Sequence, residues 1–400
     1  MVTPPGQHSA MRLCLATDTF LPEINGVTTV LAQMRDGLRD RGHEVLVLAP
    51  AYGSLLSDES GVHRLAAVPA PGYPQVRLSW PWWRGLGRVL DRFAPELLHA
   101  VTEGPLGLFG RRYAGRHRIP LVSSFHTDFP RYAAHYLGRF AVKPTRAYLR
   151  WFHNAASLTQ TPSDLTRDEL VATGIPRATV WGRGVDTAFF RPQRRSEDRR
   201  AAMGVSGDRV LVLHVGRLAV EKDVDTLVAA FRASWERLGD RAVFCVAGDG
   251  PRAAWVRAAM PWACQLGFLD RPTLADLYAD ADLFVFPSRT ETCGLVALEA
   301  LASGVPVIGA DAGGVRESLR QGITGMIVPA GNVAGFAEAI ELLVLDGEQR
   351  RAMHEAARAF AVGRDWAREL EQLESVYERL CATSSAVVAP RIWPTTTSVT

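Results

Sequence analysis

Short apolar runs alternate with amphipathic stretches along most of this 400-residue chain, and this alternation constrains its fold more than any other feature. A run such as 210–215 (VLVLHV) is too short for a helix and is rich in Val and Leu, as buried strands are. A strand that is followed by a helix and by another apolar strand predicts a βαβ unit with parallel strands. The sequence therefore predicts an α/β fold built on doubly wound parallel sheets.

The alternation occurs twice. The first series predicts strands at 11–17, 44–49, 97–101, 121–125, 157–161 and 179–181. The second series predicts strands at 210–215, 242–247, 283–286, 305–308 and 326–328. Between the two series, residues 191–200 (RPQRRSEDRR) are too polar to bury and predict a linker. We therefore expect two Rossmann-like domains.

The domain boundaries follow from these two series and from the chain length, which suits two domains. We expect a leader at 1–10, an N-terminal domain at 11–192 and a linker at 193–204. A C-terminal domain is expected at 205–382, followed by a flexible tail at 383–400. The amphipathic run 365–380 predicts a terminal helix, which we expect to pack back on the N-terminal domain. Parallel sheets bind ligands beyond the carboxyl ends of their strands, so two facing sheets predict a site between them.

The sequence lacks the motifs that are typical of several enzyme classes. The only two lysines, Lys143 and Lys222, are not followed by Ser or Thr as in a Walker phosphate loop. No strand is followed by Gly-x-Gly-x-x-Gly, and no Gly-x-Ser-x-Gly elbow occurs, so dinucleotide oxidoreductases and α/β-hydrolases are disfavoured. Asp280 and Asp282 have the Asp-x-Asp spacing of metal-dependent nucleotide-sugar sites, but they precede an apolar strand, and we expect a capping or solvated role. We predict no metal and no cofactor.

The sequence also bears on the compartment. No apolar stretch has the length of a membrane span or of a signal peptide. The five cysteines are scattered without any Cys-x-x-Cys pair, which speaks against a disulfide framework and against a cysteine-rich zinc site. We expect a cytoplasmic protein.

The segment GRLAVEK, from Gly216 to Lys222, begins where the strand predicted at 210–215 ends. An arginine fork and a lysine point charge, here Arg217 and Lys222, together suit the two or more negative charges of a diphosphate. The alternative is a pair of ordinary surface cations.

The segment ETCGLVALE places two carboxylates, Glu291 and Glu299, after the strand predicted at 283–286. A helix that begins near Gly294 would hold Glu299 on an otherwise apolar face, where an isolated carboxylate is unfavourable without a partner. Vicinal sugar hydroxyls can donate to such a carboxylate, and the alternative is a buried Glu299 paired with Arg316 or another cation. A helix start also offers backbone N–H groups to a phosphate, here at Cys293, Gly294 and Leu295.

Five motifs together carry a resemblance. They are FLPEINGV at 20–27, GRLAVEK at 216–222, AGDGP at 247–251, the glutamate pair, and DAGGVRE at 311–317. Over residues 11–380 the chain resembles the retaining GT-B glycosyltransferases of glycosyltransferase family four. SFHTD at 124–128 and WGRGVD at 181–186 resemble more narrowly the bacterial GDP-mannose-dependent α-mannosyltransferases and sulfoquinovosyl-lipid synthases. The resemblance implies the GT-B fold, two facing Rossmann-like domains with a donor and acceptor cleft between them.

The resemblance also implies roles for individual residues. Glu299 would bind the ribose, Arg217 and Lys222 the diphosphate, and Glu291 the transferring sugar. His126 would lie beside the sugar, and the alternative for a lone histidine is a structural role. The remaining positions expected to bind substrate are Asn25, Gly26, Asp128, Gly216, Gly248, Cys293, Gly294 and Leu295.

The function implied is metal-independent, retaining transfer of a hexose, mannose from GDP-mannose, to a lipid or glycolipid acceptor. The first alternative is a transferase that takes glucose or sulfoquinovose from a UDP donor. A GT-B sugar-nucleotide epimerase, a pyridoxal-dependent phosphorylase and a non-catalytic sugar-nucleotide-binding protein are further alternatives. The base of the donor would be recognised around 248–252 and 267–271, which the sequence does not resolve.

Residues 131–151 (RYAAHYLGRFAVKPTRAYLRW) combine five basic side chains with five aromatic ones and contain no acid. This composition suits an anionic bilayer surface or head group, and the aromatic residues of 80–84 (WPWWR) suit a membrane interface. The alternative is an ordinary helix with a solvated basic face. We expect peripheral contact with the inner face of the cell membrane and no nucleic-acid partner, since no nucleic-acid-binding module is visible.

Overall fold

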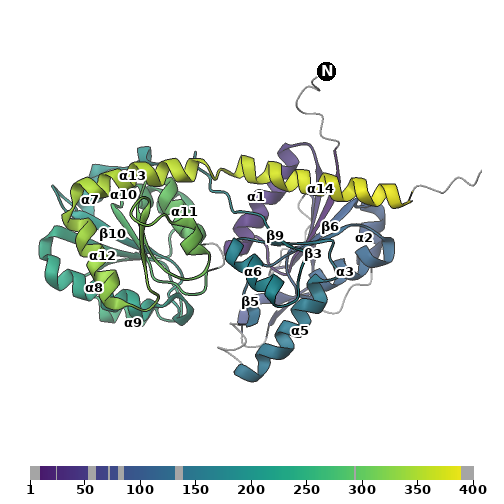
Figure 1. Ribbon diagram of the computed structural model, residues 1–400, viewed down its shortest axis with the longest axis horizontal. Helices are drawn as coiled ribbons and strands as arrows, with labels where there is room; N and C mark the ends of the chain where they lie inside the picture. Colours follow the sequence, from purple (N-terminus) through teal and green to yellow (C-terminus); the bar gives the residue numbers. More distant parts are fainter. Residues whose placement is uncertain are drawn as a thin grey trace, which may run out of the picture.

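A computed structural model describes residues 10–23, 25–52, 60–70, 73–79, 85–130, 138–291 and 294–388. The chain forms two α/β lobes that lie side by side, with α14 at its C-terminal end running over the N-terminal lobe (Figure 1). Within the described part of the chain, no helix has both the length and the hydropathy needed to span a bilayer.

The N-terminal lobe contains a seven-stranded sheet in the order β3-β2-β1-β6-β7-β8-β9, in which every pairing is parallel. Its strands are β1 Arg12–Ala16, β2 Glu44–Pro50, β3 Val62–Leu65, β6 Leu97–Ala100, β7 Leu121–Ser124, β8 Leu158–Thr161 and β9 Ala178–Val180. Its helices are α1 Gly26–Asp40, α2 Leu86–Phe93, α3 Pro105–His117, α5 Val142–His153 and α6 Asp164–Ala172. A small antiparallel hairpin joins β4 Val68–Ala70 to β5 Tyr73–Leu78. The six strands predicted for this lobe are confirmed.

The C-terminal lobe contains a six-stranded parallel sheet in the order β12-β11-β10-β13-β14-β15. Its strands are β10 Val210–Val215, β11 Ala242–Ala247, β12 Cys264–Gly267, β13 Leu283–Phe286, β14 Val307–Ala310 and β15 Gly325–Val328. Its helices are α7 Glu197–Ala202, α8 Val224–Leu238, α9 Ala253–Ala259, α10 Arg271–Asp280, α11 Leu295–Ala302, α12 Val333–Leu345 and α13 Gly347–Val362. The predicted fold class, two Rossmann-like domains, is confirmed.

Both sheets are covered on both faces, which explains their nearly continuous apolar strands. Along β10, Val210 and Val212 enter one core cluster whereas Leu211 and Leu213 enter the other, because successive side chains point to opposite faces. Edge strands β3 and β12 mix polar with apolar residues, and for this reason the sequence analysis did not predict them. The apolar pattern therefore reports the buried central strands best.

The last helix, α14 (Trp366–Val388), packs on the N-terminal lobe. The indole N–H of Trp181 donates to the backbone carbonyl of Glu369 at 2.8 Å. Further along the helix, the imidazole of His43 lies 2.8 Å from the carboxylate of Glu374. The helix continues to Val388, so the first part of the segment that we expected to be a frayed tail is helical.

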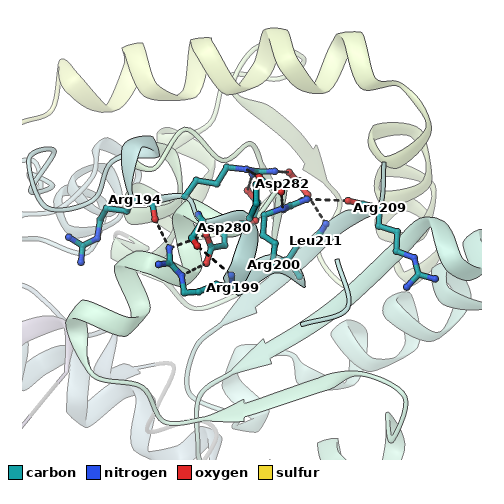
Figure 2. Close-up of polar contacts among 11 residues, drawn as sticks. Arg194, Arg199, Arg200, Arg209, Leu211, Asp280 and Asp282 are labelled. Atoms are coloured by element: carbon teal, nitrogen blue, oxygen red, sulfur yellow. Dashed lines mark hydrogen bonds and ion pairs between the residues drawn. The ribbon is translucent and has the colours of Figure 1, made fainter. Parts of the chain in front are cut away.

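The segment expected to be a solvated linker is instead anchored to the C-terminal lobe (Figure 2). Arg199 Nε donates to Asp280 Oδ2 at 2.7 Å, and Arg200 Nη1 donates to Asp282 Oδ2 at 2.9 Å. Asp282 also accepts the backbone N–H of Leu211 at 2.7 Å. The expectation that this polar segment stays exposed fails at Arg200, which is buried, while the other residues of 191–200 are exposed or partly exposed. A solvated role for the two aspartates was wrong, because both are buried. Paired charges allow a polar segment to be buried.

Candidate active site

In the C-terminal lobe, two glycine loops meet at the carboxyl ends of β10 and β11. The backbone N–H of Gly216 donates to the carbonyl of Ala247 at 3.1 Å. Gly248 has φ +137°, and a Cβ atom there would lie 1.9 Å from the carbonyl oxygen of Gly216. Only glycine allows this conformation and this approach, so the loops leave a surface of backbone groups where a diphosphate is expected.

Two of the predicted catalytic residues contact one another. Lys222 ends a short 3₁₀ turn after β10, Glu291 follows β13, and the ammonium group of Lys222 donates to Glu291 Oε1. Ser288 Oγ lies 3.4 Å from the same carboxylate oxygen. Arg217 Nη1 lies 3.8 Å from Glu221 Oε1. Because Lys222 and Glu291 are both only partly buried, the pair can exchange its mutual contact for contacts with a charged ligand.

Helix α11 begins beside these residues. Gly294 precedes it with φ +71°, and a Cβ there would lie 2.8 Å from Val315 Cγ2. The first backbone N–H groups of a helix lack intrahelical acceptors, so the α11 terminus can bind an anion. Leu295 at this terminus also packs against the core of the N-terminal lobe. Cys293 lies outside the described residues.

Glu299 lies on α11 beside Tyr278 of α10. Burial raises the pKa of Glu299 to about 7, while the neighbouring Tyr278 hydroxyl and the positive charge of Arg271 act in the opposite direction. Arg316, the alternative partner, instead lies 3.2 Å from Asp311. Hydroxyl groups placed beside this carboxylate would favour its charged form by donating hydrogen bonds to it.

In the N-terminal lobe, His126 follows β7 and contacts an arginine that comes after β9. Arg183 Nη2 donates to Nδ1 of His126 at 3.0 Å. Arg183 is buried and also lies over the ring of Trp181 at 4.7 Å. Burial, then the charge of Arg183, lowers the pKa of His126 well below its usual value. A guanidinium can only donate, so His126 is neutral and carries its proton on Nε2.

The His126 region continues into a buried chain of hydrogen bonds. His99 contacts Ser124 Oγ through Nε2 at 2.7 Å and the Tyr377 hydroxyl through Nδ1 at 2.6 Å. Burial, with the charge of Arg183, lowers the pKa of His99 to about 3. Asp128 is partly buried two residues beyond His126. Tyr377 belongs to α14, so the last helix supports this half of the site.

The first loop of the N-terminal lobe is held by Asn25 and Asp18. Asn25 caps α1, accepting the N–H groups of Val27 and Thr28 at 2.9 and 3.0 Å, so its side chain has a structural role here. Asp18 accepts the N–H of Leu106 at 3.0 Å, and burial raises its pKa to about 6. These bonds fix where the first loop ends.

The lobes contact one another at two places, one of which joins the predicted positions Gly26 and Leu295. A Cβ on Gly26 would lie 3.7 Å from Leu295 Cδ1, so the starts of α1 and α11 face each other. Glu317, in the motif DAGGVRE, accepts the backbone N–H groups of Asp164 and Leu165 at 2.9 and 2.6 Å, across the lobes. The structure therefore brings loops that follow the strands of one sheet close to loops that follow the strands of the other.

Sequence reasoning missed several residues of this region. Arg183 stands in the motif WGRGVD but was given no role, although its neighbouring glycines, 182 and 184, signalled close packing. No signal pointed to Tyr278, which looks like an ordinary core residue of α10. Glu317 belongs to a motif that the sequence analysis identified, but nothing in the sequence indicated that it would contact the start of α6. In the described part of the chain, no group of His, Cys, Asp and Glu is arranged to hold a metal ion.

Two family models match this chain. Residues 24–189 match the model of Glycosyltransferase Family 4, and residues 195–360 match that of Glycosyl transferases group 1. A GDP-mannose-dependent alpha-mannosyltransferase of Mycobacterium tuberculosis is 36% identical over 92% of this chain and 96% of its own length. The sulfoquinovosyl transferase SQD2 of Arabidopsis thaliana is 33% identical over 82% of this chain and 66% of its own length.

A solved structure extends the comparison to the fold. HepE of Anabaena, determined in complex with UDP and glucose, has a TM-score of 0.72 and 22% identity, covering 92% of this chain and 99% of that chain. It shows the same two-lobed GT-B fold. With the sequence matches over both lobes, these findings show that this chain is a glycosyltransferase and belongs to glycosyltransferase family 4.

Proposed function

We propose that this glycosyltransferase transfers mannose from GDP-mannose to a lipid or glycolipid acceptor, with retention of the anomeric configuration and without a metal ion. The observation that carries the proposal is the clustering of Arg217, Lys222 and Glu291 beside the start of α11. The donor is supported by the 36% identity with a relative named for its dependence on GDP-mannose.

The proposed mechanism follows from charge. When the bond between the sugar and the diphosphate breaks, negative charge develops on the departing oxygen. Arg217, Lys222 and the N–H groups at the start of α11 would stabilise that charge. The acceptor hydroxyl would attack from the face of the leaving group and give its proton to the departing phosphate oxygen. No enzyme nucleophile is needed for this route.

The two lobes would then have complementary tasks. Glu299 would accept hydrogen bonds from the ribose hydroxyls, and Glu291, released from Lys222 by the diphosphate, would accept from the hydroxyls of the sugar. Neutral His126, with its proton on Nε2, would donate to a sugar oxygen. Its fixed tautomer supports a positioning role rather than a role as a base.

A direct binding test identifies the donor. We would measure thermal unfolding of the protein with GDP, UDP, ADP and their common sugar conjugates, with EDTA present. Selective stabilisation by GDP and GDP-mannose is expected, because a ligand at 100 times its Kd adds about 2.7 kcal/mol to the native state. No response to any nucleotide would contradict the donor site.

Transfer itself needs a second assay. Incubation with GDP-mannose and a membrane lipid extract, followed by NMR of the product, should show an α-mannoside, which means retention. Unchanged turnover in EDTA is expected. A β-linked product, or activity lost in EDTA and restored by a divalent cation, would overturn the corresponding part of the proposal.

A different donor sugar is the second candidate, because the chain is also 33% identical to a sulfoquinovosyl transferase. Selective stabilisation by UDP and its conjugates in the binding panel would favour it. An epimerase would convert its donor without an acceptor, and a non-catalytic binder would respond to nucleotide without releasing it on addition of acceptor. The same two assays therefore separate all these candidates.

We also propose that α5 contacts an anionic membrane at the inner face of the cell membrane. Lys143, Arg146 and Arg150 are exposed on this helix. Phe140 just before this helix and Trp151 within it have 80% and 52% of their surface exposed. Exposed aromatic side chains beside basic ones suit the interface of an anionic bilayer. The remaining residues of the predicted segments, 131–137 and 80–84, lie outside the described residues.

Vesicle binding tests this surface. Co-sedimentation with vesicles of phosphatidylglycerol and phosphatidylcholine should fall for Arg146→Glu and should weaken with salt, as surface electrostatic attraction does. Arg237→Glu changes another exposed arginine, on the other lobe, and should not alter binding. Equal binding by the two variants would contradict the assignment to α5.

A further inference from the structure

Two cysteines face each other on neighbouring strands at the edge of the C-terminal sheet. Cys245 of β11 and Cys264 of β12 are direct partners in the parallel ladder. Both side chains border the same core cluster, where Cys245 is fully buried and Cys264 is partly exposed. Neighbouring strands lie about 4.8 Å apart, inside the range of about 4.4–6.8 Å between the Cα atoms of disulfide-bonded cysteines. The backbone can therefore accept a disulfide at this place.

The two thiols also contact one another and differ in reactivity. The neighbouring Cys245 thiol holds the pKa of Cys264 below its usual value, and the proximity of Cys264 together with burial raises the pKa of Cys245. The thiolate is the reactive form of cysteine. The partly exposed member of the pair is thus the nucleophile, and the buried member lies ready to resolve its oxidation. Cys14, buried in the other lobe, has its pKa raised by burial.

The pair lies directly before two loops of the candidate donor site. Beyond Cys245 the ladder shifts register between Val246 and Ala247. The backbone N–H of Gly248 then donates to the carbonyl of Gly267 at 2.7 Å. Gly248 in turn lies against the carbonyl of Gly216. A change in spacing between β11 and β12 is therefore transmitted through this contact to the loop that precedes Arg217.

We propose that Cys245 and Cys264 form a redox-responsive dithiol whose oxidation to a disulfide by a peroxide lowers the affinity for the nucleotide donor. The effect on the donor rests on the proposed function, whereas formation of the disulfide does not. Neighbouring strands lie about 4.7–4.9 Å apart, and the Cβ atoms of a disulfide lie about 3.5–4.5 Å apart. Oxidation therefore draws β12 toward β11 and displaces the contact between Gly267 and Gly248.

The chemistry is balanced in two steps. The Cys264 thiolate attacks one oxygen of hydrogen peroxide, the O–O bond breaks, and with one proton the products are a sulfenic acid and water. The Cys245 thiol then attacks the sulfenic sulfur, the S–S bond forms, and the second oxygen leaves as water. The two thiols lose two electrons in total, and the peroxide takes them up. A dithiol reductant reverses the change by thiol exchange.

Peptide mapping tests the disulfide directly. The reduced full-length protein is treated with one equivalent of hydrogen peroxide, the remaining thiols are alkylated, and the digest is analysed by mass spectrometry without reductant. A peptide pair joined through Cys245 and Cys264, which dithiothreitol releases, is expected. The pair should be absent in Cys264→Ser and present in Cys14→Ser. Overoxidised Cys264 with Cys245 still alkylated would overturn the proposal.

Nucleotide binding tests the consequence. The Kd for GDP should rise roughly fivefold or more on oxidation, the lower end of usual coupling between two sites, and should recover with dithiothreitol. Cys264→Ser should bind GDP equally well with and without peroxide, and Cys14→Ser should behave as the parent protein. A mapped disulfide with unchanged GDP affinity would overturn the coupling. If the reduced protein binds no nucleotide at all, the proposed function fails, and the peptide map still decides whether the dithiol exists.

Discussion

The two lobes form their strand-end loops in different ways. In the C-terminal lobe the loops are short, lined with glycine backbone, and closed by the partly exposed pair of Lys222 and Glu291. In the N-terminal lobe, buried hydrogen bonds join Tyr377 to His99 and His99 to Ser124, two residues before His126. These bonds hold the end of β7, which His126 follows, in place. One half of the site is therefore ready to exchange its contacts for a ligand, and the other half is fixed beforehand.

The largest effect is expected from Lys222→Ala. Loss of one donor that acts on developing charge lowers kcat by on the order of 10²-fold. Steady-state release of nucleotide would measure it, with Arg237→Ala as a control for loss of an arginine charge far from the site. Near-normal turnover would mean that the ion pair with Glu291 is structural. The C-terminal half of the site would then be as fixed as the N-terminal half.

Arg183→Met tests the fixed half. The variant removes the donor to Nδ1 of His126 and a nearby positive charge, so the pKa of His126 should rise, although burial still holds it below its usual value. We expect turnover to fall roughly tenfold, as small misplacements in active sites cause losses of up to about 10²-fold. NMR of the imidazole nitrogens reports the tautomer. Arg64→Met removes another buried arginine of the same lobe and should leave His126 unchanged.

Gly248→Ala tests the glycine loops. The variant combines a positive φ with a Cβ atom 1.9 Å from a carbonyl oxygen. Gly204→Ala has φ +81° and no heavy atom within 4 Å, so it isolates the cost of the backbone conformation. That cost is about 1–2 kcal/mol, and Gly248→Ala should exceed it and also abolish stabilisation by GDP. Chemical denaturation with and without GDP would measure both. Equal losses in the two variants would show that the close approach is relaxed in solution.

The smallest effect concerns pH. Because the pKa of Glu299 in the folded state is raised to about 7, the folded state binds more protons than the unfolded state between about 4.5 and 7, and this group makes stability fall as pH rises through that window. The raised pKa of Asp18, about 6, acts in the same direction. Melting temperatures from pH 5 to 8 should therefore fall less steeply in Glu299→Gln than in the parent protein. The exposed Glu338→Gln should match the parent, and an unchanged slope in Glu299→Gln would contradict the raised pKa.

The contrast between the lobes also explains what the sequence could predict. The C-terminal half of the site lies in contiguous motifs such as 216–222 and 291–299, so its residues were found together. The N-terminal half depends on contacts between distant positions, such as His126 with Arg183, and no periodic pattern encodes these. Buried ion pairs were missed for the same reason, since Arg200 looks solvated until Asp282 is placed beside it.

The alternation of apolar runs predicted both sheets because central parallel strands are buried on both faces. It failed at β3 and β12, two edge strands in which polar side chains interrupt the apolar run. The run 365–380 predicted a helix that packs back on the N-terminal domain, but its pattern did not show how many of its residues enter that core. Residues such as Leu373 fill that core, yet they have the same amphipathic spacing as any surface helix.

That last helix has a consequence for the synthesis of the protein. The N-terminal lobe is translated first, but Leu373 and Tyr377, both fully buried in it, emerge from the ribosome only after the whole C-terminal lobe. Until then, the apolar surface that α14 covers is open to water and to chaperones. The first lobe therefore cannot complete its folding before the second lobe has been made, although domains usually fold in the order of their synthesis.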